Sequence, residues 1–154
     1  ALTSCSKTDD SEEIRRLVRQ GVKLAEAHDI RGLIKQTTED FLANPGGYDR
    51  LKVRKILFRA FRYYGEFKIV HPRPIVELGI DDKTASARVY FLIVRKDISM
   101  PELDLLYNDP KGWLAEVGEN ADLYRLSLEL LKRKANWLVK LALLESFTGM
   151  GFSE

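Results

Sequence analysis

The hydrophobic pattern of this chain changes period at Gly65, and that change limits the fold most strongly. Before Gly65, apolar residues recur at helical spacing, whereas residues 85–94 alternate with a period of two, which is typical of a strand. Helices followed by strands, rather than alternating with them, predict an α+β domain. At 154 residues, 45% of them apolar, the chain has the size of one domain with a single core.

Three N-terminal helices are predicted, over residues 10–27, 29–38 and 49–64. Asp10 and Glu13 form a capping box at the start of the first helix. Gly65 stands where a left-handed cap would end the third helix.

About four strands are predicted to follow, over residues 67–78, 85–94, 124–131 and 137–144. Pro72 and Pro74 interrupt the first strand, because proline cannot donate a ladder hydrogen bond, and imply an edge, a bulge or a bend. The strands should form a strongly bent antiparallel sheet with the helices on one face. Residues 98–123, between the two hairpins, are too long for a simple turn, so we expect an insertion with short helical pieces beginning near Pro101 and Pro110.

The segment Leu2-Thr3-Ser4-Cys5 resembles the end of a bacterial lipoprotein signal peptide, with Cys5 as the lipidated residue. The alternative is an incidental thiol near the start of the chain. On the first interpretation, residues 1–10 are a lipobox and a solvated tether, and residues 11–154 form the domain. Ser6 after the cysteine then favours the outer membrane, with the domain on the periplasmic face of the cell envelope.

Charge and residue counts argue against several kinds of site. The 25 basic and 23 acidic residues leave a net charge of +2, so a nucleic-acid binder driven by bulk charge is not indicated. One cysteine and two histidines offer no spacing typical of a zinc or haem site. We therefore expect no metal, no cofactor and no nucleic-acid partner.

The order of elements resembles the nuclear transport factor 2-like superfamily, the cone-shaped fold of ketosteroid isomerases and polyketide cyclases. The residues that carry the resemblance lie in three segments, 29–38, 81–89 and 134–139. The resemblance implies a sheet that wraps around the first helix and leaves a pocket at the wide end of the cone. It places Ala87, Val89, Phe91 and Ile93 toward the helices and Arg95 near the pocket mouth.

The candidate ligand-binding residues are Tyr64, Phe91, Arg95 and Trp113, although the two tyrosines at 63 and 64 also suit the core and Arg95 also suits a salt bridge. His71 is the weak catalytic candidate, because a lone histidine without an orienting carboxylate is more often structural. No acidic residue falls clearly on the inward register of the strands. Glu66, Glu77 and Glu129 are candidates only if that register is shifted.

Two surfaces suggest partners. Lys52, Lys55, Arg59 and Arg62 form a basic stripe on the third helix, which is either a solvated face or a contact for anionic headgroups. The outer sheet face would carry Tyr90, Leu92 and Val94 beside either Leu126, Leu128 and Leu130 or the neighbouring register. Such an apolar face predicts a homodimer through the sheet or burial under residues 98–123.

These observations favour a lipid-anchored, extracytoplasmic binding domain that is not an enzyme. Its ligand would be an apolar small molecule in the cone or a protein partner on the sheet. One alternative is a small isomerase, cyclase or dehydratase in which His71, a tyrosine and an acidic residue converge on a hydrophobic substrate. Another is an assembly component of an envelope complex.

Overall fold

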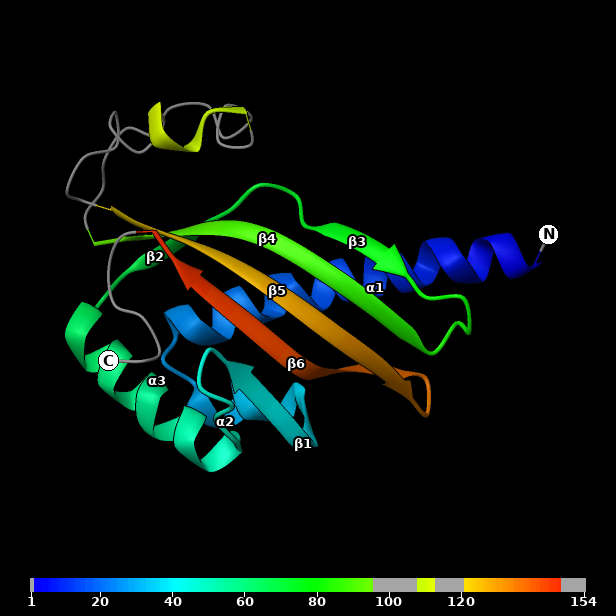
Figure 1. The fold of residues 1–154 in the computed structure, drawn as a ribbon, viewed down its shortest axis with the longest axis horizontal. Coiled ribbons are helices and arrows are strands. Elements are labelled where there is room, and N and C mark those ends of the chain that lie inside the picture. The colour runs from blue at the N-terminus through cyan, green and yellow to red at the C-terminus, as the bar shows by residue number, and fades with distance from the viewer. Residues whose placement is uncertain (1, 96–107, 113–120, 148–154) are drawn as a thin grey trace.

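The computed structural model describes residues 2–95, 108–112 and 121–147, and for residues 2–8 the backbone alone (Figure 1). Three helices and a six-stranded mixed sheet make up the described fold, so the α+β fold class is confirmed. In chain order the elements are α1 (Leu2–Glu26), α2 (Ile30–Lys35), β1 (Thr37–Asn44), α3 (Arg50–Tyr64), β2 (Lys68–Val70), β3 (Ile75–Leu78), β4 (Thr84–Val94), β5 (Ala121–Arg133) and β6 (Asn136–Ser146).

Helix α1 begins at Leu2, so the capping box predicted at Asp10 is wrong, and residues 2–10 of the predicted lipobox and tether are helical. Asp10 is instead buried inside the helix, where its Oδ1 accepts hydrogen bonds from Lys132 Nζ at 2.8 Å and from Trp137 Nε1 at 3.2 Å. A buried carboxylate needs such partners, and here they come from the far hairpin of the sheet. This contact ties the first half of α1 to the sheet.

The other two helices follow the sequence signals. The Asp29 carboxylate accepts a hydrogen bond from the Gly32 N–H, and Asp49 accepts one from Lys52, so both are N-caps. Gly65 ends α3 with φ +65°, a conformation that favours glycine, and its N–H donates to the Phe61 carbonyl.

The observed sheet has six strands instead of about four, because one predicted strand is split in two and one strand was not predicted. The prolines split the predicted strand 67–78 into β2 and β3, which both pair antiparallel with β4. The β5–β6 hairpin turns at Lys134 and Ala135, which both have positive φ. The strand that sequence reasoning missed is β1. It pairs in parallel with β6, and the register of this pairing shifts between Thr37 and Leu42. The sheet is therefore mixed, in the order β1-β6-β5-β4-β2, with β3 beside β4.

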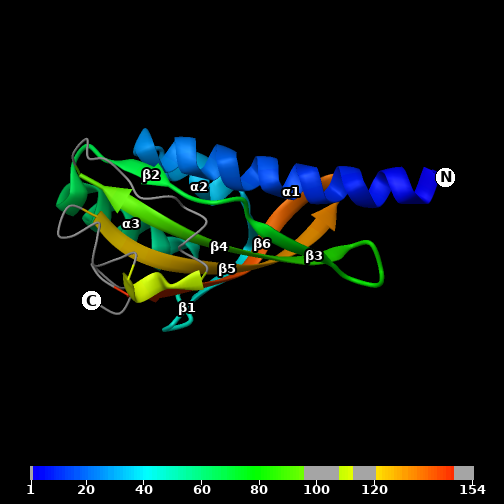
Figure 2. The same cartoon turned by 90° about the horizontal axis from the view of Figure 1, so that it is seen from above.

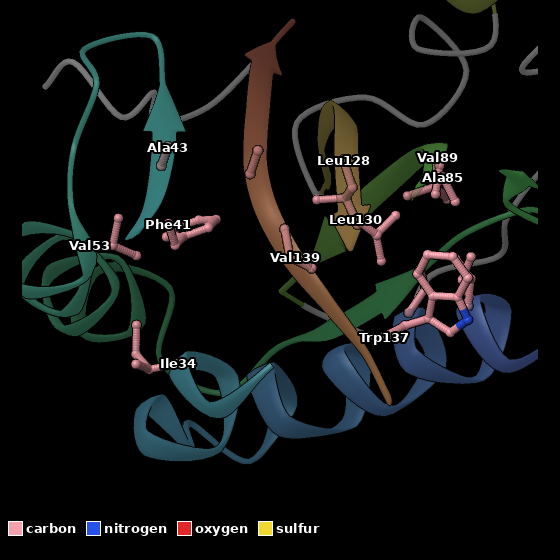
Figure 3. Packing of buried hydrophobic residues seen from close by; sticks show 14 residues of the cluster. Ile34, Phe41, Ala43, Val53, Ala85, Val89, Leu128, Leu130, Trp137 and Val139 are labelled. Carbon is pink, nitrogen blue, oxygen red and sulfur yellow. The ribbon is translucent and has the colours of Figure 1, made fainter. Parts of the chain in front are cut away.

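Helices α1 and α3 cover one face of the bent sheet (Figure 2). Ala87 and Val89 are buried on this face, and Val89, Phe91 and Ile93 turn toward the helices, as predicted. The main core cluster joins α1, α2, α3 and the inner sheet face (Figure 3). Its labelled members include Ile34, Val53, Leu128, Trp137 and Val139. Burial of each such side chain stabilises the fold by about 1.5–3 kcal/mol before conformational entropy is subtracted.

The outer sheet face uses the second of the two registers considered above. Leu92 lies opposite Leu123 and Val94 opposite Ala121, whereas Leu126, Leu128 and Leu130 belong to the inner face. Leu92 and Val94 are buried, while three apolar side chains of the outer face, Leu42, Ile75 and Leu143, remain exposed. Within the insertion, residues 110–112 are helical, whereas the helical piece expected near Pro101 and the side chain of Trp113 lie outside the described residues.

In the part of the chain that the structure describes, no helix has the length and apolar character needed to cross a membrane.

Candidate functional site

A cavity of about 280 Å³ lies between the inner sheet face and helices α1 and α3. Its volume is just below the roughly 300–1,000 Å³ range of small-molecule sites. Aliphatic and aromatic side chains form most of its wall. Representative members are Val22 of α1, Val53 and Ala60 of α3, Val89 of β4, Leu126 of β5 and Leu144 of β6. The cone is therefore hollow, and its interior suits an apolar molecule.

Two polar residues of the wall are occupied by the fold itself. Gln36 Nε2 donates to the Leu17 carbonyl at 3.1 Å. Thr37 Oγ1 donates to the Ile34 carbonyl and accepts from Arg50 Nε at 2.9 Å. Because these groups hold α1, α2 and α3 together, they contribute little polarity to the cavity.

A cluster of polar side chains stands where α3 meets the first residues of β5. Tyr64 and Tyr124 line the cavity, and their hydroxyls lie 2.6 Å apart. The Tyr64 hydroxyl also donates to Asp122 Oδ2 at 2.7 Å. Since one phenol has one proton, the Tyr64 proton goes to the carboxylate and Tyr64 accepts the hydrogen bond from Tyr124.

Arg95 compensates the charge of this cluster. Its Nη2 lies 3.1 Å from Asp122 Oδ2 and 3.2 Å from the Tyr63 hydroxyl, and its guanidinium lies over the rings of Tyr63 and Tyr64. Burial raises the pKa of Tyr64, and the hydrogen bonds with Tyr124 and Asp122 raise that pKa further. Tyr64 is therefore a neutral phenol at any physiological pH.

His71 lies on the segment between β2 and β3 and its ring also lines the cavity. Its Nδ1 is 2.8 Å from the Pro72 carbonyl oxygen. A carbonyl oxygen only accepts, so Nδ1 carries the proton and Nε2 of the neutral ring has the lone pair. The hydrogen bond of His71 and those of the tyrosine pair join different residues.

The predicted site residues fall in different places. Tyr64 and Phe91 line the cavity, and Phe91 stacks on Tyr124 with ring centroids 5.2 Å apart. Arg95 is not in the cavity wall and is bound to Asp122 instead. Trp113 and the side chain of Cys5 lie outside the described residues.

The three conditional acidic candidates lie away from the cavity. Glu77 and Glu129 line a groove on the outer sheet face, and Glu66 is exposed after α3. Asp122 is the carboxylate that lies on the inner register, opposite Ile93, and sequence reasoning missed it together with Tyr124. The alternation of Asp122, Tyr124 and Leu126 could have revealed both, had the strand been extended back beyond residue 124.

Among the described residues, no group of three or more His, Cys, Asp or Glu side chains is arranged to hold a metal ion.

Comparison with solved structures gives the fold. An NTF2-like protein with a cystatin-like fold from Novosphingobium aromaticivorans superposes with a TM-score of 0.68 at 16% identity, covering 97% of this chain and 89% of that one. This chain has the nuclear transport factor 2-like fold. A candidate scytalone dehydratase from the same organism gives a TM-score of 0.69 at 12% identity, covering 94% of this chain and 89% of that chain.

A third structure with the nuclear transport factor 2-like fold, ActVI-ORFA from Streptomyces coelicolor, gives a TM-score of 0.64 at 13% identity and covers 88% of this chain and 96% of that one. No protein-family model and no curated protein matches the sequence. At these identities the likeness concerns the fold, and fold alone does not assign an activity.

Proposed function

We propose that this domain binds an apolar small molecule in the cavity and does not transform it. The observation that carries the proposal is the composition of the wall, in which aliphatic and aromatic side chains surround a hollow of about 280 Å³. Transfer of apolar surface from water into such a hollow is favourable by roughly 25 cal/mol per Å². The cavity is therefore suited to retain a ligand by burial rather than by charge.

The pairing of the ionisable groups supports binding over catalysis. A general base must be able to take a proton from a bound molecule. Asp122 is engaged by Arg95 and by the Tyr64 hydroxyl, and the proton of Tyr64 is directed at Asp122 rather than at the cavity. The cluster thus contributes the two tyrosines to the cavity wall, while its charged groups are paired with one another.

The binding proposal can be tested with Nile red, an uncharged probe whose fluorescence rises in apolar surroundings. Leu144 lines the cavity, whereas the adjacent Leu143 points to the opposite sheet face. We expect the larger side chain of Leu144→Trp to fill part of the cavity and weaken Nile red binding by about tenfold or more. The probe would then bury less apolar surface, by an amount that corresponds to about two to three methylene groups. Leu143→Trp, the matched control, should bind as the unmodified protein does. Equal binding by both variants would show that the probe sits elsewhere.

A small isomerase, cyclase or dehydratase is the second candidate, because His71, Tyr64 and Tyr124 all line one cavity. His71 Nε2 would remove a proton and a phenol would stabilise the resulting oxyanion. The test is deuterium exchange at the α-carbon of an apolar cyclic ketone in heavy water. An enzyme of this kind should accelerate the exchange, and His71→Phe should abolish the acceleration. Exchange at the rate of buffer alone would remove this candidate.

We also propose that Cys5 carries a lipid and holds the domain at the periplasmic face of the outer membrane. The segment Leu2-Thr3-Ser4-Cys5 and the following Ser6 support this proposal. Expression behind a lipoprotein signal peptide tests it, with membrane fractionation as the readout. The protein should enter the membrane fraction, and Cys5→Ala should release it, whereas Ser4→Ala should not change the fractionation.

A further inference from the structure

The outward face of α3 carries several cations and no acidic side chain. The helix Arg50–Tyr64 contains no Asp or Glu. Its residues at spacings of four, three and four form one line along the axis, which we call the basic ridge: Leu51, Lys55, Phe58 and Arg62, flanked by Lys52, Arg54 and Arg59. All seven side chains are exposed.

The cations of the basic ridge have no acidic partner within the described part of the chain. The ion pairs there join other residues, and none includes Lys52, Arg54, Lys55, Arg59 or Arg62. The Arg62 guanidinium lies instead over the Phe58 ring, 5.8 Å from its centroid. Unpaired charges at this density attract an anionic partner.

The apolar members of the basic ridge favour a partner that is both anionic and apolar. Leu51 is 63% exposed and Phe58 57% exposed, so both stand in water in the middle of the cationic line. On a convex helix, apolar side chains between long basic ones match a membrane interface. There Phe and Leu enter the headgroup–acyl boundary while Lys and Arg extend to the phosphates.

Nucleic acid fits this surface less well. An exposed leucine would gain nothing from a phosphate backbone.

We propose that the basic ridge of α3 docks on the surface of an anionic phospholipid bilayer. The opposite face of the same helix contributes Val53, Ile56 and Ala60 to the cavity wall, so docking would bring the hollow within one helix diameter of the lipid. The docking proposal stands independently of what the cavity binds, because it rests on the outward face alone.

The test uses the protein without lipid on Cys5 and vesicles of phosphatidylcholine, alone or with an equimolar amount of phosphatidylglycerol. Binding should require phosphatidylglycerol and weaken as salt is added. Each lost cation should cost about fivefold in partitioning, so Lys55→Gln with Arg62→Gln should weaken binding about 25-fold.

The matched control removes the same charge at the other end of the molecule. Lys83 and Lys134 are exposed in the turns before β4 and between β5 and β6, far from α3 (Figure 1). Lys83→Gln with Lys134→Gln should change vesicle binding by less than about threefold. If this control weakens binding as much as the ridge variant does, net charge rather than the basic ridge is responsible and the proposal is wrong.

A third pair of variants tests insertion. Phe58→Ala should weaken binding about tenfold, through loss of buried apolar surface. The tryptophan emission of Phe58→Trp should shift to the blue on phosphatidylglycerol vesicles and be quenched by brominated lipid. Circular dichroism of each variant confirms that it is folded. Unchanged vesicle affinity of Phe58→Ala, with tighter binding of the unmodified protein to a single-stranded oligonucleotide, would assign the surface to nucleic acid and overturn the proposal.

Discussion

The Tyr64 hydroxyl donates a 2.7 Å hydrogen bond to Asp122 Oδ2 and thereby joins the last residue of α3 to the start of β5, 58 positions along the chain. Both side chains are buried, and Arg95 completes the cluster from the end of β4. A hydrogen bond to a charged group in such surroundings contributes more than one in water. The contact therefore fixes the end of α3 against β5 beside the cavity.

A double-mutant cycle measures that contact. Tyr64→Phe and Asp122→Asn should each lower the free energy of unfolding by about 1–3 kcal/mol, because each leaves a buried polar partner less well satisfied. The double variant should lose less than the sum, with a coupling of about 1 kcal/mol, when unfolding by urea is followed. Strict additivity of the two losses would contradict direct contact between the two side chains.

The raised pKa of Tyr64 gives the stability a specific pH dependence. In the folded protein this phenol keeps its proton above its usual pKa, whereas in the unfolded chain it releases the proton near pH 10. The unfolded state then binds fewer protons above that pH, so stability falls by up to about 1.4 kcal/mol per pH unit there and is unaffected below it.

The control for this pH dependence is the neighbouring, exposed Tyr63. Urea midpoints measured from pH 8 to pH 11, a window chosen around the tyrosine pKa of about 10, should fall less steeply for Tyr64→Phe than for the unmodified protein. Tyr63→Phe should follow the unmodified protein. Parallel curves for all three would contradict the environment described for Tyr64.

Asp10 should contribute far more to the free energy of unfolding than its neighbour Asp9. Asp10→Ala removes the acceptor of Lys132 and Trp137 at a buried position, so we expect a loss of about 1–3 kcal/mol in the free energy of unfolding. Asp9 is exposed on the same helix, and Asp9→Ala should change the stability by less than about 0.5 kcal/mol. Thermal unfolding of the pair measures the difference. Two equally mild variants would mean that this part of α1 is not packed on the sheet.

The exposed apolar residues of the outer sheet face keep the homodimer prediction testable. Leu143 is 38% exposed between Leu42 and Ile75 on that face. We expect sedimentation velocity to give a dimer for the unmodified protein and a monomer for Leu143→Arg, because a buried unpaired charge opposes association. Leu51→Arg, at a more exposed leucine on α3, should remain a dimer. A monomer for the unmodified protein would contradict this prediction.

Local signals made most of the fold predictable. Asp29 and Asp49 cap the starts of α2 and α3, and Gly65 ends α3, as the sequence indicated. The alternation of residues through β4 predicted correctly which of them face the helices. Strand β1 escaped prediction because Thr37–Asn44 has no regular alternation and is stabilised by a non-local parallel pairing with β6. The start of α1 was misplaced because Asp10 has the chemistry of a cap, while its partners, Lys132 and Trp137, are more than a hundred residues away.

The site was less predictable than the fold. Phe91 and Tyr64 could be placed toward the interior from periodicity and from the end of a helix. The cluster of Tyr64, Asp122 and Tyr124 depends on how far β5 extends into the predicted insertion, which the sequence pattern left open. The sequence left Arg95 as either a ligand-binding residue or a salt-bridge partner. The choice of Asp122 as its partner depends on the register of β5, which the sequence pattern did not define.

The central claim is that the cavity binds an apolar molecule, and methyl NMR during titration with decanol tests it most directly. We predict chemical-shift changes at the methyl groups that line the cavity on four different elements, namely Val22, Val53, Leu126 and Leu144. The exposed Leu42, Leu51 and Leu143 should not shift. Changes confined to those exposed leucines, or no changes at saturating decanol, would contradict the account.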